Sequence, residues 1–409
     1  MKFYKLTPQQ RREVLAEENI NLADINEKEL AKLNNLSENV VGQVSLPLGV
    51  VENLIVNGKS YWVPMSVEEP SVVAAANHGA SIFAQNSGVV ADSQRDGIYG
   101  QIVLRVNNSF SLNELNDNFS EYIALANNEF ASLVHHGGGV RSIEASQKEN
   151  LVYLKVLVDP AEAMGANKTN SILEFLSQKM TKLAGVEEKL FAILSNYPSQ
   201  LTTAKVKLSV DTIGGLEVAK KIALLAKIGY DDPYRAATNN KGIMNGVDSV
   251  LIATGNDYRG VEAATAVLAS QSGQYRSLSS WKVEGSYLLG KLTLPLAIGT
   301  VGGSISVRED IQQSFSILKN VNSTELANII TAIGLANNFA ALLAISTKGI
   351  QAGHMKLQAR NIVATLNATD IEREKVLTEM ITSKEFSQSS AQELLLKLRK
   401  EEEYNEYRN

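Results

Sequence analysis

The chain of 409 residues contains no cysteine and only four histidines. The absence of thiols excludes disulfides, a thiolate nucleophile and Cys-ligated zinc or iron–sulfur sites. His135 and His136 adjoin three glycines but lack a nearby acidic partner at ligand spacing, so we expect no metal site. His78 lies within a predicted helix and is expected to be structural. His354 follows a long Ala-rich segment, and its type suits proton transfer near neutral pH.

Several familiar motifs are also missing. The sequence has no Gly-Lys-Ser/Thr phosphate loop, no strand-associated GxGxxG and no GxSxG. It has no uninterrupted apolar run of about 18 residues, and its N-terminus lacks an apolar core long enough for a signal peptide. The formal net charge of -5 does not favour nucleic acid or anionic membranes. We expect a soluble cytoplasmic protein that binds neither.

The composition is that of an ordinary globular protein, with 44% hydrophobic and 20% charged residues. The length suggests two or three domains. A β-α-β-β-α-β order is predicted between residues 99 and 197, which is the ferredoxin-like arrangement. Its predicted elements are strands at 99–106, 137–146, 150–159 and 188–197, and helices at 112–133 and 163–185.

The remaining segments predict a larger α+β domain that encloses this small one. Residues 216–230 and 322–347 have helical patterns, and Asn322 followed by Glu325 is a helix-start signal. The small residues of the second segment indicate close packing and burial. The charged last sixty residues predict a helical appendage. The expected organisation is a large domain in two parts (1–107 and 206–350), a small domain (108–205) and a C-terminal segment (351–409).

The stretch "NNKGIMNGVDSVLIATGND" (239–257) has Lys241 and Asp257 at the two ends of an apolar run. Because both charges lie in turn-prone clusters, we expect them in loops that flank a buried segment. Asp257 could equally be the N-cap of the helix that follows it. Glu69 precedes Pro70, which suits the first turn of a helix. Composition and spacing alone predict only a soluble α/β enzyme of unknown type.

Five segments together resemble the class II, soluble bacterial, hydroxymethylglutaryl-coenzyme A reductases. They occur in the family's order between residues 38 and 361: "ENVVGQVSLPLGV", "VEEPSVVAAA", "AMGAN", "DPYRAATNNKGIMNGVDSVLIATGND" and "GHMKLQARN". The resemblance implies reduction of 3-hydroxy-3-methylglutaryl-CoA to mevalonate and CoA by two NAD(P)H, without a metal. The small domain would then bind the dinucleotide, which is consistent with the missing GxGxxG.

The resemblance also implies the catalytic residues. Lys241 would stabilise the oxyanion that forms when hydride attacks a carbonyl, and Glu69 would supply a proton to the aldehyde-level oxygen. Asp257 would hold Lys241, and we expect it to lie between Lys241 and Glu69. His354 would protonate the departing CoA thiolate.

Binding residues are carried over from the same motifs. The substrate contacts implied are Arg235, Ser71 and Asn245. The implied cofactor contacts are Met164, Gly165, Asn167 and Asn196, with Glu162 where the family has aspartate. Phe130 occupies the position at which NADH-preferring relatives carry an aspartate. Because a missing carboxylate removes repulsion against a 2'-phosphate, we expect NADPH, with NADH possible as an alternative.

Two other functions remain open: the catabolic direction, in which NAD and CoA oxidise mevalonate, and a CoA-binding protein without catalysis. The presence of all four catalytic residue types argues against the second. The resemblance further implies a homodimer or higher oligomer with active sites at the interface, and a C-terminal flap that closes over bound ligands.

Overall fold

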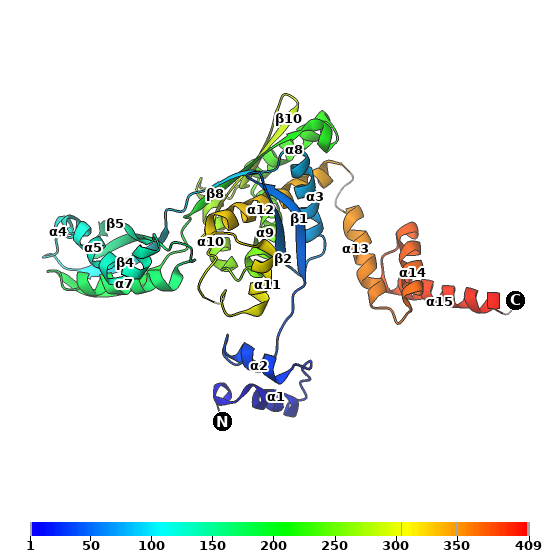
Figure 1. Ribbon diagram of the computed structural model, residues 1–409, viewed down its shortest axis with the longest axis horizontal. Coiled ribbons are helices and arrows are strands. Elements are labelled where there is room, and N and C mark those ends of the chain that lie inside the picture. The colour runs from blue at the N-terminus through cyan, green and yellow to red at the C-terminus, as the bar shows by residue number, and fades with distance from the viewer. Residues whose placement is uncertain (1, 304, 348–350, 407–409) are drawn as a thin grey trace. The chain divides into compact units, whose positions relative to one another are not determined.

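The computed structural model describes residues 2–303, 305–347 and 351–406, with side chains omitted for 351–357 and 401–406. It is a mixed α+β protein, as the sequence predicts (Figure 1). The chain divides into two compact units, Met1–Pro47 and Leu48–Asn409.

The N-terminal unit is a short helical segment held together by arginines. It contains η1 (Phe3–Lys5), α1 (Pro8–Glu17) and α2 (Glu27–Asn34). Thr7 and Gln10 form a capping box at the start of α1, which explains why a polar segment begins a helix there. Arg11 is buried, and its guanidinium donates to Asn34 Oδ1 (2.8 Å) and to the Val40 carbonyl (3.2 Å).

Two antiparallel sheets form the strand framework of the large domain. One pairs β1 (Leu48–Val56) with β2 (Lys59–Ser66). The other has the order β3-β8-β10-β9, with bounds Val90–Ser93, Leu201–Ser209, Tyr287–Pro295 and Ser279–Glu284. In this sheet Ser93 of β3 faces Thr202 of β8.

The central element of the large domain is α12 (Ser323–Ser346), which Figure 1 shows among its other helices and strands. Asn322 and Glu325 form the expected capping box. By length and composition α12 could cross a membrane, but 78% of its most apolar window is buried inside the protein. The predicted close packing is confirmed, because a Cβ at Gly79 would lie 2.4 Å from the Ala336 carbonyl oxygen.

Further helices surround this core. They are α3 (Val72–Gln85), η2 (Val210–Ile213), α8 (Leu216–Asp231), α9 (Pro233–Ala253), α10 (Tyr258–Ser270) and α11 (Glu309–Leu318). α9 and α3 pack against α12. His78 of α3 is exposed, so it contributes little to the core.

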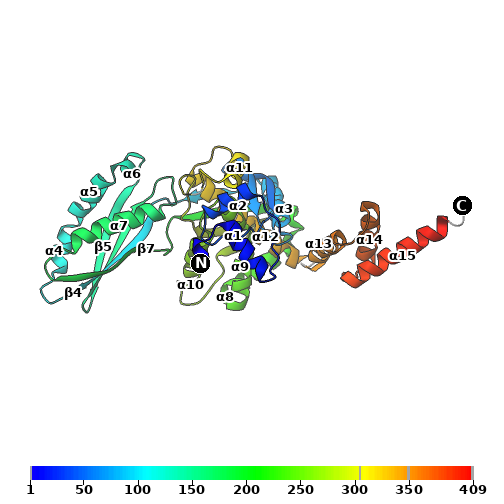
Figure 2. The ribbon, with the colours of Figure 1, turned by 90° about the horizontal axis from the view of Figure 1, so that it is seen from below.

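The small domain has the predicted β-α-β-β-α-β order. Its antiparallel sheet has the order β5-β6-β4-β7, with bounds Gly139–Lys148, Leu151–Asp159, Ile98–Val106 and Val186–Leu194. Its helices are α4 (Leu112–Asp117), α5 (Phe119–Glu129), α6 (Ala131–His135) and α7 (Ala166–Met180). Figure 2 shows α7 lying across the sheet, where Ile172, Leu173 and Leu176 enter a separate apolar core.

The C-terminal segment has its own small core. Its helices are α13 (Gln351–Ala364), α14 (Asp370–Ser383) and α15 (Gln388–Glu406), which share buried residues such as Val363, Val376 and Leu395. The expected domain limits stay predictions. The strand pairing places β4, which begins at Ile98, with the small sheet, and β8, which begins at Leu201, with the large one.

Candidate functional site

Lys241 and Glu69, two residues far apart in the sequence, meet in a direct ion pair. Lys241 Nζ lies 2.5 Å from Glu69 Oε2. Their side chains are 59% and 37% exposed, so this pair adds at most about 1 kcal/mol to folding stability. An ammonium and a carboxylate that are accessible and adjacent can instead act on a ligand that binds between or beside them.

α9 positions Lys241. The expectation that Lys241 lies in a loop is wrong, because the helix runs without interruption from Pro233 to Ala253. Asp232 caps its start, with its Oδ1 3.1 Å from Tyr234 N, and Pro233 occupies the first turn. The asparagines that suggested a turn have buried partners instead: Asn239 Nδ2 donates to Ser277 Oγ at 2.6 Å.

Glu69 lies in the connection between β2 and α3. The prediction that Pro70 opens the helix is wrong, because α3 begins at Val72 and Ser71 is its N-cap. Ser71 has φ +78°, a left-handed conformation that keeps Pro70 out of the helix. Such backbone strain in a non-glycine residue is typical of functional sites. The Ser71 side chain makes no cap bond to the helix.

Asp257 is the N-cap of α10, one of the two roles that the sequence left open. Its Oδ1 accepts from Gly260 N at 3.1 Å. The expectation that Asp257 lies between Lys241 and Glu69 is wrong for this chain, because those two groups are in direct contact. Helix capping fixes the Asp257 carboxylate on a different element from either of them.

Asp257 faces a cavity of about 90 Å³ whose walls come from both the small and the large domain. Met164 and Asn196, two of the predicted cofactor contacts, line the same cavity, together with Tyr197 and Pro295. A Cβ added to Gly260 would lie 2.7 Å from Asp257 Oδ2 and 3.2 Å from Asn196 Oδ1. The cavity therefore brings a predicted catalytic residue together with predicted cofactor contacts.

Arg235 and Asn245 lie on the same helix as Lys241. Asn245 is four residues after Lys241, so the two share one face of α9. Arg235 is half-buried, and its Nε is buried without a hydrogen-bond partner among the described residues. An unpartnered guanidinium nitrogen is costly in isolation, and an anionic ligand could satisfy it.

The predicted cofactor segment "AMGAN" forms the turn into α7. Gly165 is the N-cap of this helix and has φ +96°. A Cβ there would lie 2.3 Å from Pro160 Cβ, so the turn needs glycine. Asn167, in the first turn of α7, is exposed. The backbone N–H groups at this helix start are suited to an anionic ligand group.

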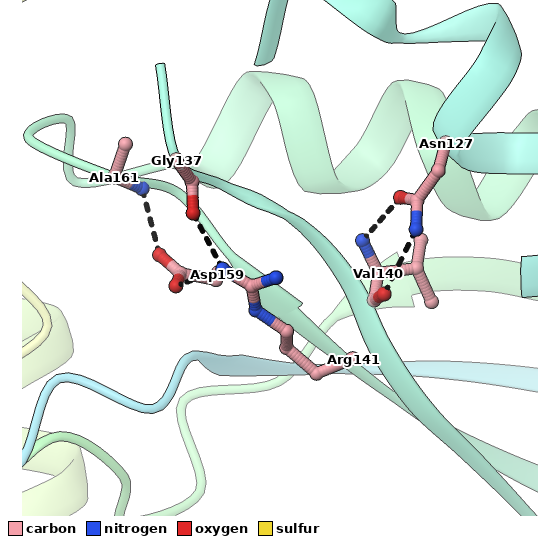
Figure 3. A network of polar contacts seen from close by, with 6 residues as sticks. All are labelled: Asn127, Gly137, Val140, Arg141, Asp159 and Ala161. Atoms are coloured by element: carbon pink, nitrogen blue, oxygen red, sulfur yellow. Dashed lines mark hydrogen bonds and ion pairs between the residues drawn. The ribbon is translucent and has the colours of Figure 1, made fainter. Parts of the chain in front are cut away.

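A polar network connects this segment to the glycine-rich loop (Figure 3). Arg141 pairs with Asp159 at 2.8 Å and donates to the Gly137 carbonyl at 2.5 Å. Asp159 Oδ1 also accepts from Ala161 N at 2.9 Å. Asn127 binds both backbone groups of Val140. The two loops are therefore tied together at one end of the small sheet.

His354 lies within the bounds of α13. Its side chain is outside the described residues, so its predicted role stays a prediction.

Sequence reasoning did not identify Asp248, although a carboxylate within the apolar run "GVDSVL" indicates an acidic group on a largely buried segment. It lies seven residues after Lys241, on the same helical face. Burial, a hydrogen bond with Glu262 and the charge of Glu262 raise the pKa of Asp248 to about 8. Its Oδ1 has no hydrogen-bond partner among the described residues.

Comparisons with known proteins agree with these features. A family model described as hydroxymethylglutaryl-coenzyme A reductase matches residues 7–359. The chain is 35% identical to 3-hydroxy-3-methylglutaryl-coenzyme A reductase of Archaeoglobus fulgidus, over 97% of this chain and 94% of that protein.

Solved structures give the same result. A reductase of this name from Streptococcus pneumoniae superposes with a TM-score of 0.75 at 36% identity, covering 97% of this chain and 99% of that one. A class II enzyme from the same organism, bound to NADPH in open conformations, gives a TM-score of 0.74 at 37% identity. It covers 96% of this chain and 99% of its own.

Proposed function

We propose, since the chain belongs to the hydroxymethylglutaryl-coenzyme A reductase family, that it makes mevalonate in the biosynthetic direction with NADPH. The family reaction is the four-electron reduction of 3-hydroxy-3-methylglutaryl-CoA to mevalonate and CoA by two NAD(P)H. The observation that carries the proposal is the 2.5 Å contact between Lys241 and Glu69. It brings together two predicted catalytic groups from separate motifs.

The residues near the cavity suit a nicotinamide cofactor. The turn before α7 needs Gly165, because Pro160 fills the space that a Cβ would occupy, and Met164 and Asn196 line the cavity beside Asp257. When bound, NADPH supplies the hydrides.

Lys241 is proposed to stabilise the developing oxyanion of the substrate carbonyl, since its ammonium is exposed and fixed on a rigid helix. Glu69, the carboxylate partner of that ammonium, then takes a proton from Lys241 Nζ and passes it to the aldehyde-level oxygen, so that the oxyanion is neutralised. Their contact keeps the two groups within reach of the same oxygen. The hydroxymethylglutaryl part of the substrate is proposed to bind to Asn245 and Ser71. Arg235 is proposed to bind the carboxylate of the substrate or a phosphate of CoA.

Asp257 is proposed to assist Lys241 through the electrostatic field of its carboxylate, not through the direct contact expected from sequence. His354 is proposed to protonate the CoA thiolate. We further propose that the protein works in the cytoplasm as a homodimer with active sites at the interface.

The surroundings of Phe130 support NADPH over NADH. Its ring packs edge-on against Phe175, with 6.0 Å between ring centroids, and Lys168 Nζ lies 5.6 Å from the Phe130 centroid. A cation therefore stands near the position where NADH-preferring relatives carry an aspartate. A 2'-phosphate would be attracted to such a site.

The test follows nicotinamide absorbance with 3-hydroxy-3-methylglutaryl-CoA and either NADPH or NADH. We expect oxidation of both cofactors, with the higher kcat/KM for NADPH. Absence of oxidation with either would reject the reductase function and favour a non-catalytic CoA-binding protein. Faster turnover with mevalonate, NAD and CoA would favour the catabolic direction.

His354→Gln tests the thiolate role. Only the thioester step expels a thiolate, so the variant should lose much more activity on 3-hydroxy-3-methylglutaryl-CoA than on free mevaldehyde. Equal losses on the two substrates would reject this role.

A further inference from the structure

Residues 296–301, which follow β10, touch several parts of the proposed site and are called the connector below. Leu296, Ile298 and Gly299 of this segment are buried. None of these residues carries an ionisable group. Their contacts run to the loop before α10, to the AMGAN segment and to the linker between β3 and β4, through which the chain enters the small domain.

Asn256, the residue before Asp257, binds both backbone groups of Gly299. Asn256 Nδ2 donates to the Gly299 carbonyl at 3.1 Å, and Gly299 N donates to Asn256 Oδ1 at 2.9 Å. Asn256 is 6% exposed, so water does not compete for these bonds. A buried two-point bond of this kind fixes both the distance and the orientation of the connector relative to Asp257.

On its other side the connector contacts the AMGAN segment. A Cβ at Gly299 would lie 2.3 Å from Met164 N and 2.5 Å from the Ala163 carbonyl carbon. Ala163 forms a parallel β-bridge with Val301, and Thr300 N donates to the Glu162 carbonyl at 2.9 Å. The backbones are therefore in direct contact, which only glycine at 299 allows.

Two charged residues, Arg95 and Glu162, fix the connector and the segment before AMGAN to neighbouring parts of the chain. Arg95 donates to the carbonyls of Leu296 and Ile298, both at 2.8 Å. Glu162 Oε2 accepts from Ser323 N, the first residue of α12, at 2.7 Å. Burial lowers the pKa of Arg95 to about 10, while the charges of Glu162 and Asp159 act in the opposite direction. The guanidinium therefore stays charged at neutral pH.

We infer that Asn256 and Gly299 are positioning residues, which hold the nicotinamide-contact segment at a fixed distance from Asp257. The inference rests on the proposed function of both segments. Hydride transfer requires the reacting atoms to be aligned within a fraction of an ångström, and a misplacement of about 1 Å can cost about 10²-fold in rate. When the connector is no longer held by Asn256, the cofactor contacts within the small domain remain. The variant should therefore lower kcat more than it raises the KM for NADPH.

The test compares Asn256→Ala with Asn57→Ala. Asn57 binds both backbone groups of Ala91 in the same way, each at 2.9 Å, but lies away from the proposed site. Asn57 is exposed, so this variant reports what losing a two-point bond from a side chain to the backbone does to stability, outside the buried setting of Asn256. Asn57 has φ +50°, so alanine at this position also adds backbone strain. The control variant should therefore lose at least as much folding stability as a variant that only loses the two hydrogen bonds.

We expect Asn256→Ala to lower kcat by about 10²-fold with less than about a threefold change in the KM for NADPH. The deuterium isotope effect on kcat, measured with NADPH labelled at the transferred position, should rise because hydride transfer becomes slower. Asn57→Ala should keep the wild-type kcat and isotope effect. A kcat within about threefold of wild type in Asn256→Ala, or equal losses in both variants, would overturn the inference.

A second measurement separates this inference from the proposed function. If wild-type protein shows no reductase activity, amide hydrogen exchange still tests the mechanical link. Peptides that cover residues 161–167 should exchange about 10-fold faster in Asn256→Ala than in wild type and in Asn57→Ala. Unchanged exchange in that segment would reject the link whatever the enzyme's activity.

Discussion

At the residue scale, Lys241 is the side chain on which the proposed chemistry depends most. Lys241→Met should lower kcat by about 10² to 10³-fold, because the oxyanion loses its cation. Stability should barely change, since the ammonium is 59% exposed. The control is Lys220→Met on α8, which removes another exposed lysine that pairs with a glutamate, Glu217. Steady-state kinetics and thermal melts check both, and a comparable kcat for the two variants would contradict the role of Lys241.

Asp248 predicts a pH-dependent stability. The native protein keeps this proton up to about pH 8, whereas the unfolded chain releases it near pH 4. The native state therefore loses stability as pH rises between these values. Asp248→Asn should raise the free energy of unfolding at pH 8.5 by on the order of 2 kcal/mol. The figure is below the full shift, because partial exposure lets water relax around the charge.

The gain from Asp248→Asn should shrink towards zero at pH 4, which urea unfolding at several pH values will measure. Asp92→Asn, on an exposed position of β3, is the control and should show no such trend. A gain that does not depend on pH would show that packing, and not the proton, explains it.

At the element scale, α9 offers a matched pair of glycines. A Cβ at Gly246 would lie 3.1 Å from Ile333 Cγ2 and from Asn337 Cγ, both on α12, whereas nothing lies within 4 Å of one at Gly242. Gly246→Ala should destabilise the protein by about 1–3 kcal/mol through overpacking. Gly242→Ala should stabilise it by up to about 1 kcal/mol through helix propensity. Denaturant midpoints that move in the same direction for both would contradict this account of the α9–α12 contact.

The elements also show how far sequence reasoning reaches. The small domain was predictable because its apolar residues alternate along the strands and recur at helical spacing along α7. α9 was not, because its Asn and Gly residues favour turns locally, and their partners Ser277 and Asn337 lie on other segments. Likewise, the residue types before α3 do not predict the left-handed backbone conformation of Ser71. The family motifs named Glu69 and Lys241, but their direct contact needed the tertiary structure.

At the scale of the whole molecule, the proposal predicts self-association. Light scattering should give at least twice the chain mass of 44.4 kDa under conditions where the protein is active. Dilution that produces monomers should lower the specific activity in parallel, because a site at an interface is incomplete in one subunit. A fully active monomer would contradict the proposed interface site.

The register between β3 and β8 has a consequence for descent. Ser93 faces Thr202, so the intervening hundred or so residues occupy what would otherwise be the turn of a single β-hairpin. They leave close to where they enter, because Ser195 N donates to the Tyr99 carbonyl at 2.7 Å. An insertion or deletion at that turn could add or remove the whole small domain without breaking a strand pair of the large domain. The large and the small domain can thus have separate ancestries within one polypeptide.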